Sequence, residues 1–140
     1  MKSKILIIST LAFLFLSTIA CEKDENDSTN EPATDTTAPL ITILLPDTAT
    51  QYISGMKMPI SIKAEDNDEM HELHLNVVNT TQKDSVMLHV HKHSHGQVAL
   101  MDTAFIIPDL GMHQDYEIRV TASDHNANES TKTVHKHVHM

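Results

Sequence analysis

The chain has 140 residues, enough for one small domain, and its 19 acidic side chains outnumber the 10 lysines and arginines. The net charge of −9 at pH 7 argues against a nucleic-acid partner, because binding to phosphates needs a basic surface. A single cysteine excludes an intrachain disulfide. The 11 histidines exceed the lysines and arginines together, and this excess is the main indication of function.

The N-terminal segment predicts a signal peptide over residues 1–20. Two lysines precede an apolar run over residues 5–20, which at sixteen residues is short for a membrane span. The run ends in Ile-Ala directly before Cys21, and this resembles the lipobox of bacterial lipoproteins, although Thr18 stands where leucine is usual. The resemblance implies cleavage before Cys21 and diacylation of its thiol. The alternative is an ordinary signal peptide followed by an incidental cysteine.

Residues 21–38 predict a disordered tether. Beyond the cysteine they are rich in acids and contain no aliphatic side chain larger than alanine, so they cannot bury enough apolar surface to fold. Stretched towards polyproline II at about 3.1 Å per residue, residues 22–38 would span roughly 50 Å. The acidic run 22–25 resembles the export signals of surface-displayed lipoproteins in Bacteroidota. We therefore expect a lipid anchor in the outer membrane of a bacterial cell envelope, with the domain either periplasmic or surface-exposed.

From residue 39 onward, apolar and polar residues alternate with a period of two, and no segment has the spacing of an amphipathic helix. We therefore predict an all-β domain over residues 39–140. Seven short strands separated by turn residues fit a two-sheet immunoglobulin-like (Ig-like) β-sandwich. The strands are predicted at 40–45, 58–65, 72–79, 85–93, 98–107, 116–123 and 131–139.

Turn motifs and one tyrosine stand at the ends of these predicted strands. The motifs are Asp35-Thr36-Thr37-Ala38-Pro39, Ala64-Glu65-Asp66, and Ala122-Ser123-Asp124 with Asn128. Tyr116 follows Leu110 by six positions and opens an alternating run, which resembles the tyrosine corner of fibronectin III domains, where the phenol caps the preceding loop. Together these features resemble single bacterial Ig-like modules of the fibronectin III and cadherin type. They are most similar to small histidine-rich lipoproteins of Bacteroidota whose function is not established, so the resemblance implies a fold and a location but no chemistry.

Strand alternation predicts where the histidines of segment 85–93 point, because successive side chains of a strand take opposite faces. Val86, Leu88 and Val90 take the core face, and Met87, His89, His91 and His93 take the solvent face. The register that keeps the apolar residues buried also leaves 81–84 as a four-residue hairpin loop. It pairs Leu75 with Val90, Val77 with Leu88, His74 with His91, Asn76 with His89, and Glu72 with His93.

Imidazoles from two neighbouring strands in this register can bind one metal ion. We predict His74, His91 and His93 as ligands, with His89 in reserve, and Glu72 as an orienting group or a fourth ligand. Zinc and copper suit imidazole ligands, and nickel is an alternative. The competing interpretation is that solvent-facing strand positions simply tolerate histidine.

Two further groups are candidate cation sites. His135, His137 and His139 share one face of the last strand and form a separate cluster, which could instead be a frayed metal-scavenging tail. Loop oxygens at one end of the sandwich could hold calcium. The competing interpretation is that Asp and Asn serve as turn residues. The candidate calcium ligands are Asp35, Asp66, Asp68, Asp124 and Asn128.

No sequence motif for a catalytic nucleophile, a nucleotide loop or a zinc protease is present, so we expect no enzymatic activity. The leading hypothesis is a membrane-anchored module that binds a transition metal for sequestration or delivery. The alternative is a non-catalytic adhesion or scaffold module of the envelope that binds protein or glycan. The chain has few aromatic side chains on which a glycan could stack, which counts against a glycan partner. Tyr52 and Tyr116 are the only tyrosines, and there is no tryptophan. A third hypothesis is pH sensing by the crowded imidazoles.

Overall fold

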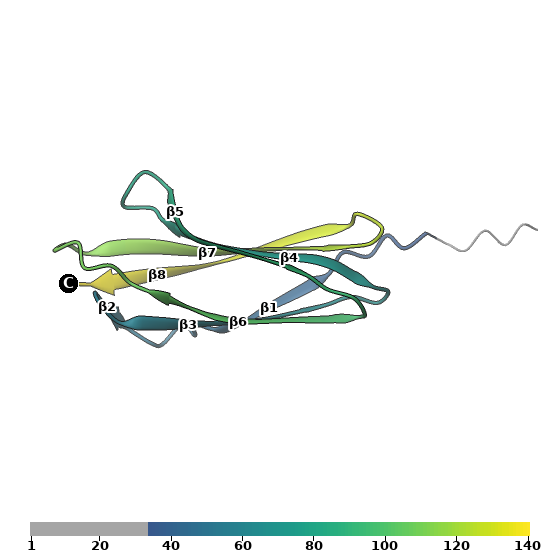
Figure 1. Cartoon of the computed structure of the whole chain (residues 1–140), viewed down its shortest axis with the longest axis horizontal. Helices are drawn as coiled ribbons and strands as arrows, with labels where there is room; N and C mark the ends of the chain where they lie inside the picture. Colours follow the sequence, from purple (N-terminus) through teal and green to yellow (C-terminus); the bar gives the residue numbers. More distant parts are fainter. Residues whose placement is uncertain (1–33) are drawn as a thin grey trace, which may run out of the picture. The chain divides into compact units, whose positions relative to one another are not determined.

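The computed structural model describes residues 34–140. The alternation of apolar and polar residues along this part of the chain produces two stacked β-sheets (Figure 1). The predicted signal peptide, Cys21 and most of the predicted tether lie outside the described residues. Within residues 34–140, no helix is long and apolar enough to cross a membrane. The all-β class is confirmed for this part of the chain.

The two sheets contain eight strands between residues 40 and 139. One sheet has the order β1-β3-β6, and the other has the order β2-β8-β7-β4-β5. All paired strands are antiparallel except β2 and β8. The strands are β1 (Leu40–Leu45), β2 (Tyr52–Ile53), β3 (Lys57–Glu65), β4 (Met70–Asn79), β5 (Ser85–His93), β6 (Val98–Ile106), β7 (Gln114–Asp124) and β8 (Glu129–His139).

The predicted count of seven strands is wrong, because the sequence reading missed β2. This strand has two residues, too few for alternation to be visible, and it runs parallel to the end of β8 with Ile53 paired to His139. Its Tyr52 is 3% exposed and belongs to the core. The other seven strands match the predicted ones, with ends that differ by two residues or fewer.

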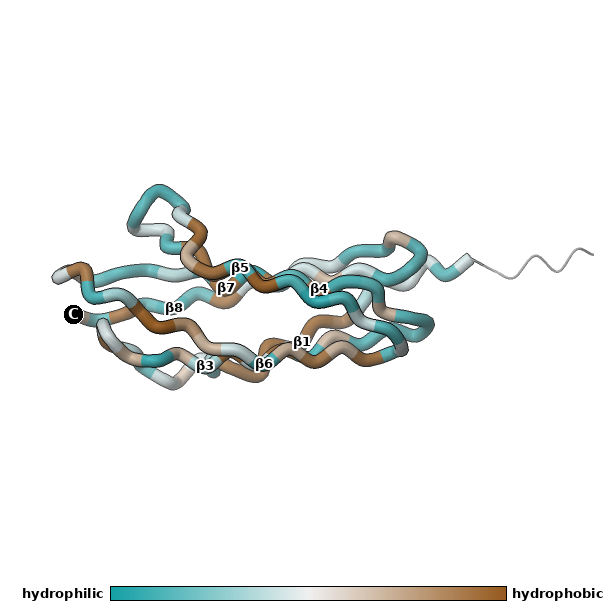
Figure 2. Tube along the Cα trace, viewed as in Figure 1, coloured by the Kyte–Doolittle hydropathy of each residue, from teal (hydrophilic) through white to brown (hydrophobic). Residues whose placement is uncertain are grey.

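The core lies between the sheets and is filled by alternate residues of the central strands. Leu75 on β4, Val120 on β7 and Ile62 on β3 are each 0–1% exposed. Burial of one such side chain contributes about 1.5–3 kcal/mol. The loop between β4 and β5, by contrast, is hydrophilic (Figure 2). Because alternate residues of the central strands fill the core, the side chains between them face outward and are available for other chemistry.

The pairing of β4 with β5 has the predicted register in its regular part. Leu75 faces Val90 and His74 faces His91, as the apolar pattern requires. The register then shifts between Val77 and Val78, which leaves Met87 without a partner, and the hairpin loop has five residues (80–84). Because of this shift Val86 is 58% exposed, so its predicted place in the core is wrong. The hairpin tip curls away from the sandwich (Figure 1).

Tyr116 stabilises the loop before β7 through an intermediate side chain. Its hydroxyl donates a hydrogen bond to the side-chain oxygen of Gln114. The side-chain nitrogen of Gln114 donates to the carbonyl oxygen of Pro108 at 2.9 Å, and Asn79 donates to the Gln114 oxygen at 2.9 Å. Gln114 is fully buried. This network fixes the backbone on either side of Gln114, including the neighbouring His113.

Replacing Gln114 with alanine should lower the free energy of unfolding by about 3 kcal/mol, because the buried groups of Tyr116 and Asn79 would lose their partner. Urea denaturation of the full-length chain measures this loss. The control is Gln82→Ala, since the Gln82 side chain is exposed. Equal stability of the two variants would contradict the role given to the Gln114 network.

Candidate metal centres

Seven of the histidines form a continuous row of rings along β4, β5 and the loops beside them. We call this row the histidine track. Several of its members come from segments far apart in sequence, because the antiparallel pairing brings those segments to one edge of the larger sheet. In spatial order the rings are His89, His74, His91, His93, His71, His125 and His95, with successive centroids 4.4 to 6.0 Å apart.

Glu72 lies at the centre of the track. One of its oxygens is 2.9 Å from Nε2 of His74, and the other is 3.6 Å from Nε2 of His91 and 3.5 Å from Nδ1 of His93. The hydrogen bond with His74, followed by the charges of His91, His71 and His93, holds the pKa of Glu72 below its ordinary value. Glu72 is therefore a carboxylate at neutral pH, with both oxygens facing imidazoles.

Two groups of potential ligands share this carboxylate. Glu72, His74 and His91 form one group, and His71, Glu72 and His93 form the other, with ligand atoms within 4.8 Å of one another in each. The rings of His74 and His91 are stacked, with centroids 4.4 Å apart and planes 4° from parallel. The structure thus brings two of the predicted ligands together and places the third, His93, in the adjoining group. Glu72 can bind a metal from either side.

His89 takes a different position from the other predicted ligands. Its Nδ1 lies 2.8 Å from the side-chain oxygen of Asn76, the residue opposite it on β4. Its ring is 6.0 Å from His74, at the far end of the track from Glu69. Among the described residues His89 belongs to neither group around Glu72.

Sequence reasoning missed the other end of the track. Glu69, His95 and His125 form a third group, with an oxygen of Glu69 3.5 Å from Nδ1 of His95 and 3.9 Å from Nε2 of His125. These residues lie in or beside three different loops that meet at one end of the sandwich. His71 was also missed, because the register shifts between Met70 and Glu72 and makes His71 an extra residue in β4. Simple alternation cannot predict such a residue.

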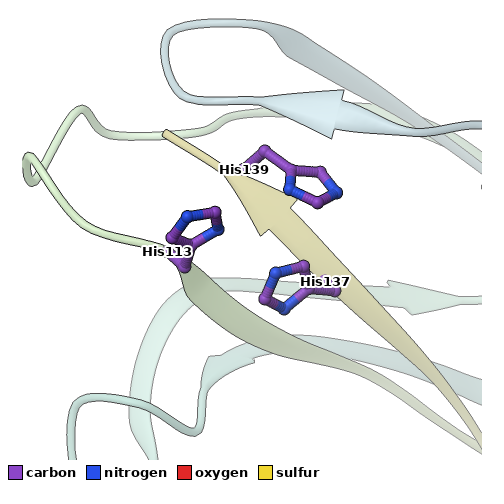
Figure 3. A group of neighbouring side chains, drawn as sticks. All are labelled: His113, His137 and His139. Carbon is purple, nitrogen blue, oxygen red and sulfur yellow. The ribbon is translucent and has the colours of Figure 1, made fainter.

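A separate three-histidine group lies at the end of β8 (Figure 3). His113, His137 and His139 each offer a ring nitrogen within 4.8 Å of the others. The prediction for β8 named His135 instead of His113. His135 is highly exposed and lies near Glu117, with Nδ1 3.6 Å from a Glu117 oxygen. It stands four residues from His139, about 13 Å along a strand, which is too far for a shared ion.

Three of the five predicted calcium ligands form a group of carboxylates. Oxygens of Asp35, Asp66 and Asp124 lie within 4.8 Å of one another. One oxygen each of Asp35 and Asp66 is buried and accepts no hydrogen bond from the described residues. These two oxygens are the atoms available to a hard cation such as calcium.

The other two predicted calcium ligands form hydrogen bonds beside this group. Asn128 donates its side-chain nitrogen to Asp124 at 2.7 Å and to the carbonyl oxygen of Asp35 at 3.1 Å. Asp68 accepts a hydrogen bond from Asn126 at 3.3 Å and stands outside the group. Asp124 also accepts the backbone N–H groups of Asn126 and Asn128, both at 2.8 Å. Much of this constellation therefore closes the β7–β8 turn.

Replacing Asp124 with alanine should lower the free energy of unfolding by about 2–3 kcal/mol, because three hydrogen bonds to a buried carboxylate are lost. Thermal and urea unfolding of the full-length chain measure the change. The neighbouring Asp68→Ala serves as the control, since Asp68 is exposed. A loss for Asp124→Ala no larger than that for Asp68→Ala would disprove the turn-closing role.

The fold and the candidate sites define a two-sheet β-sandwich that carries histidine groups on its larger sheet. No family model matches the sequence, and no curated protein matches it. The crystal structure of Spo0M, a sporulation control protein from Bacillus subtilis, is similar in fold, with a TM-score of 0.50 at 9% sequence identity. The match covers 74% of this chain and 50% of Spo0M, so the chain spans about half the length of that protein. A similarity at this identity shows the fold alone.

Proposed function

We propose that the chain is an exported, lipid-anchored protein of the bacterial envelope whose Ig-like domain binds a transition metal through the histidine track. The order of the two sheets, β1-β3-β6 and β8-β7-β4-β5, supports the Ig-like assignment. The leader and the cysteine that follows it support export and anchoring. One observation carries the metal proposal: a single carboxylate, Glu72, has four imidazoles around it.

The ligand chemistry of this centre favours borderline divalent ions. Imidazole nitrogens suit zinc, copper and nickel, and a carboxylate adds negative charge that partly neutralises the ion. The two oxygens of Glu72 face His74 on one side and His91 and His93 on the other. The same carboxylate can therefore serve one ion or bridge two.

The position of the centre favours sequestration or delivery. Its histidines lie on the outer positions of β4 and β5, and the ring of His93 is 60% exposed. The core between the sheets is filled by apolar side chains, and none of the track's histidines belongs to it. A metal at Glu72 would thus be open to exchange with solvent or with another protein, and folding would not require it.

Replacing His74, His91 and His93 together with alanine should remove the metal bound at Glu72. We expect the affinity of the sites at Glu72 for Zn²⁺ and Cu²⁺ to fall at least about tenfold. Replacing even a residue that only positions a metal ligand lowers metal affinity by about this factor. Equilibrium dialysis of the full-length chain with each ion measures the number of sites and their affinity.

The matched control is His135→Ala. His135 is also an exposed strand histidine with a glutamate oxygen 3.6 Å from its ring, as His91 is. This control should bind like the unmodified chain. If the triple variant keeps the same number of sites at the same affinity, the proposed function is wrong.

A second candidate function is adhesion, supported by apolar residues on the outside of the smaller sheet. Leu40 is 67% exposed, Leu44 52%, Leu100 52% and Ile106 70%. Such residues can bind another protein of the envelope without any metal. A pull-down from outer-membrane extracts, repeated with a chelator, separates the candidates, because only capture through the metal should be lost with the chelator.

A further inference from the structure

We propose that His113, His137 and His139 form a second transition-metal site, independent of the histidine track and made of imidazoles alone. The ladder between β7 and β8 ends with Gln114 paired to Val138 and Asp115 paired to His137. One further step in that register places His113 opposite His139. Gln114 and Val138 are both fully buried. Because neighbouring side chains of a strand take opposite faces, His113, His137 and His139 all face outward.

The ring geometry is close to that of a bound site. The centroid of the His113 ring is 5.4 Å from those of His137 and His139, and the latter two are 4.8 Å apart. A tetrahedral zinc ion with Zn–N bonds of about 2.0–2.1 Å needs nitrogens about 3.3 Å apart. The ligand nitrogens already lie within 4.8 Å of one another, so small side-chain rotations suffice (Figure 3).

Asp115 prepares His137 for this role. Its oxygen lies 2.7 Å from Nδ1 of His137, which leaves Nε2 of that ring for a metal. A carboxylate behind a ligating histidine fixes the ring and makes its other nitrogen a stronger donor. Asp115 is thus a positioning residue, in contrast to Glu72, which stands among the ligands of the track.

The backbone that carries the three ligands is held on both sides. His113 precedes the buried Gln114, whose side chain bonds to Pro108 at 2.9 Å. At the other strand, the carbonyl oxygen of His139 accepts the backbone N–H of Ser54 at 2.9 Å, because β2 pairs with the end of β8. The alternative of a frayed histidine tail therefore does not describe β8. Ligands on paired strands are better fixed than ligands on free chain ends.

The two sites are separate in space and in chemistry. On β7, Asp115 marks the three-histidine site and Ser123, paired with Glu72, marks the track. Eight residues of strand place Glu72 about 26 Å from the three-histidine site, and the two sites share no ligand. A site of three neutral imidazoles leaves the charge of a divalent ion uncompensated and at least one position open. We therefore expect Cu²⁺ to bind most tightly, followed by Zn²⁺ or Ni²⁺, with an exchangeable outer ligand.

The test uses a full-length background variant in which the track is disabled by Glu72→Gln, His74→Ala, His93→Ala and His125→Ala. These changes leave each group of the track with at most two of its three ligands. The background should still bind one equivalent of Zn²⁺ or Cu²⁺ in equilibrium dialysis. Adding His113→Ala should weaken that binding at least about tenfold, whereas adding His135→Ala should leave it within about twofold. Circular dichroism without metal checks that each variant is folded.

The outcomes separate this site from the proposed function. The proposal is overturned if the background variant binds no ion, if His113→Ala binds as tightly as the background, or if His135→Ala weakens binding equally. It is supported if His113→Ala alone reduces binding, even where the track itself proves to bind nothing. Histidine ring NMR signals provide a second readout, because Zn²⁺ should shift those of His113, His137 and His139 and leave that of His135 unchanged.

Discussion

The register of four antiparallel strands is the constraint on which the rest of the structure depends. In β4 and β7, one set of alternate side chains fills the core, which Val138 of β8 joins and against which Leu88 and Val90 of β5 pack. The other set lies on the outer face of the larger sheet. Because β4 is also paired with β7, a slip of one residue between β4 and β5 would turn β5 over, moving its imidazoles to the inner face and exposing Leu88 and Val90. The free energy that keeps the core apolar therefore also keeps His74 opposite His91.

Irregularities in these ladders add what regular alternation does not provide. The shift between Met70 and Glu72 inserts His71, whose ring lies 5.6 Å from that of His93. The shift beside Val77 leaves Met87 unpaired, and the tip of the edge hairpin then turns away from the sandwich. Bulges of this kind redirect side chains and are frequent next to functional sites. The regular strand pairing sets the spacing of the candidate ligands, and the bulge between Met70 and Glu72 adds His71 to them.

Sequence reasoning succeeded where one periodic pattern decided the outcome. Alternation was enough to predict seven of the eight strands and the pairing of Glu72 with His93. It failed where position depends on contacts between distant segments. His95 and His125 meet only because their loops share one end of the fold, and two-residue β2 exists only because β8 extends far enough to pair with it. His113 was within reach, since extending the β7–β8 register by one residue places it opposite His139.

Carboxylates occupy different places in the two kinds of histidine group, and this difference has chemical consequences. Glu72 can bind an ion directly, so an ion at the track would keep a smaller net charge and attract fewer anions. Asp115 instead lies behind His137 and leaves the ion to neutral nitrogens alone. A divalent ion held only by imidazoles retains its charge and favours an anionic ligand in its open position. Glu72 and the three-histidine group lie beside opposite ends of β7, and the two groups could offer chemically distinct environments to one class of metal.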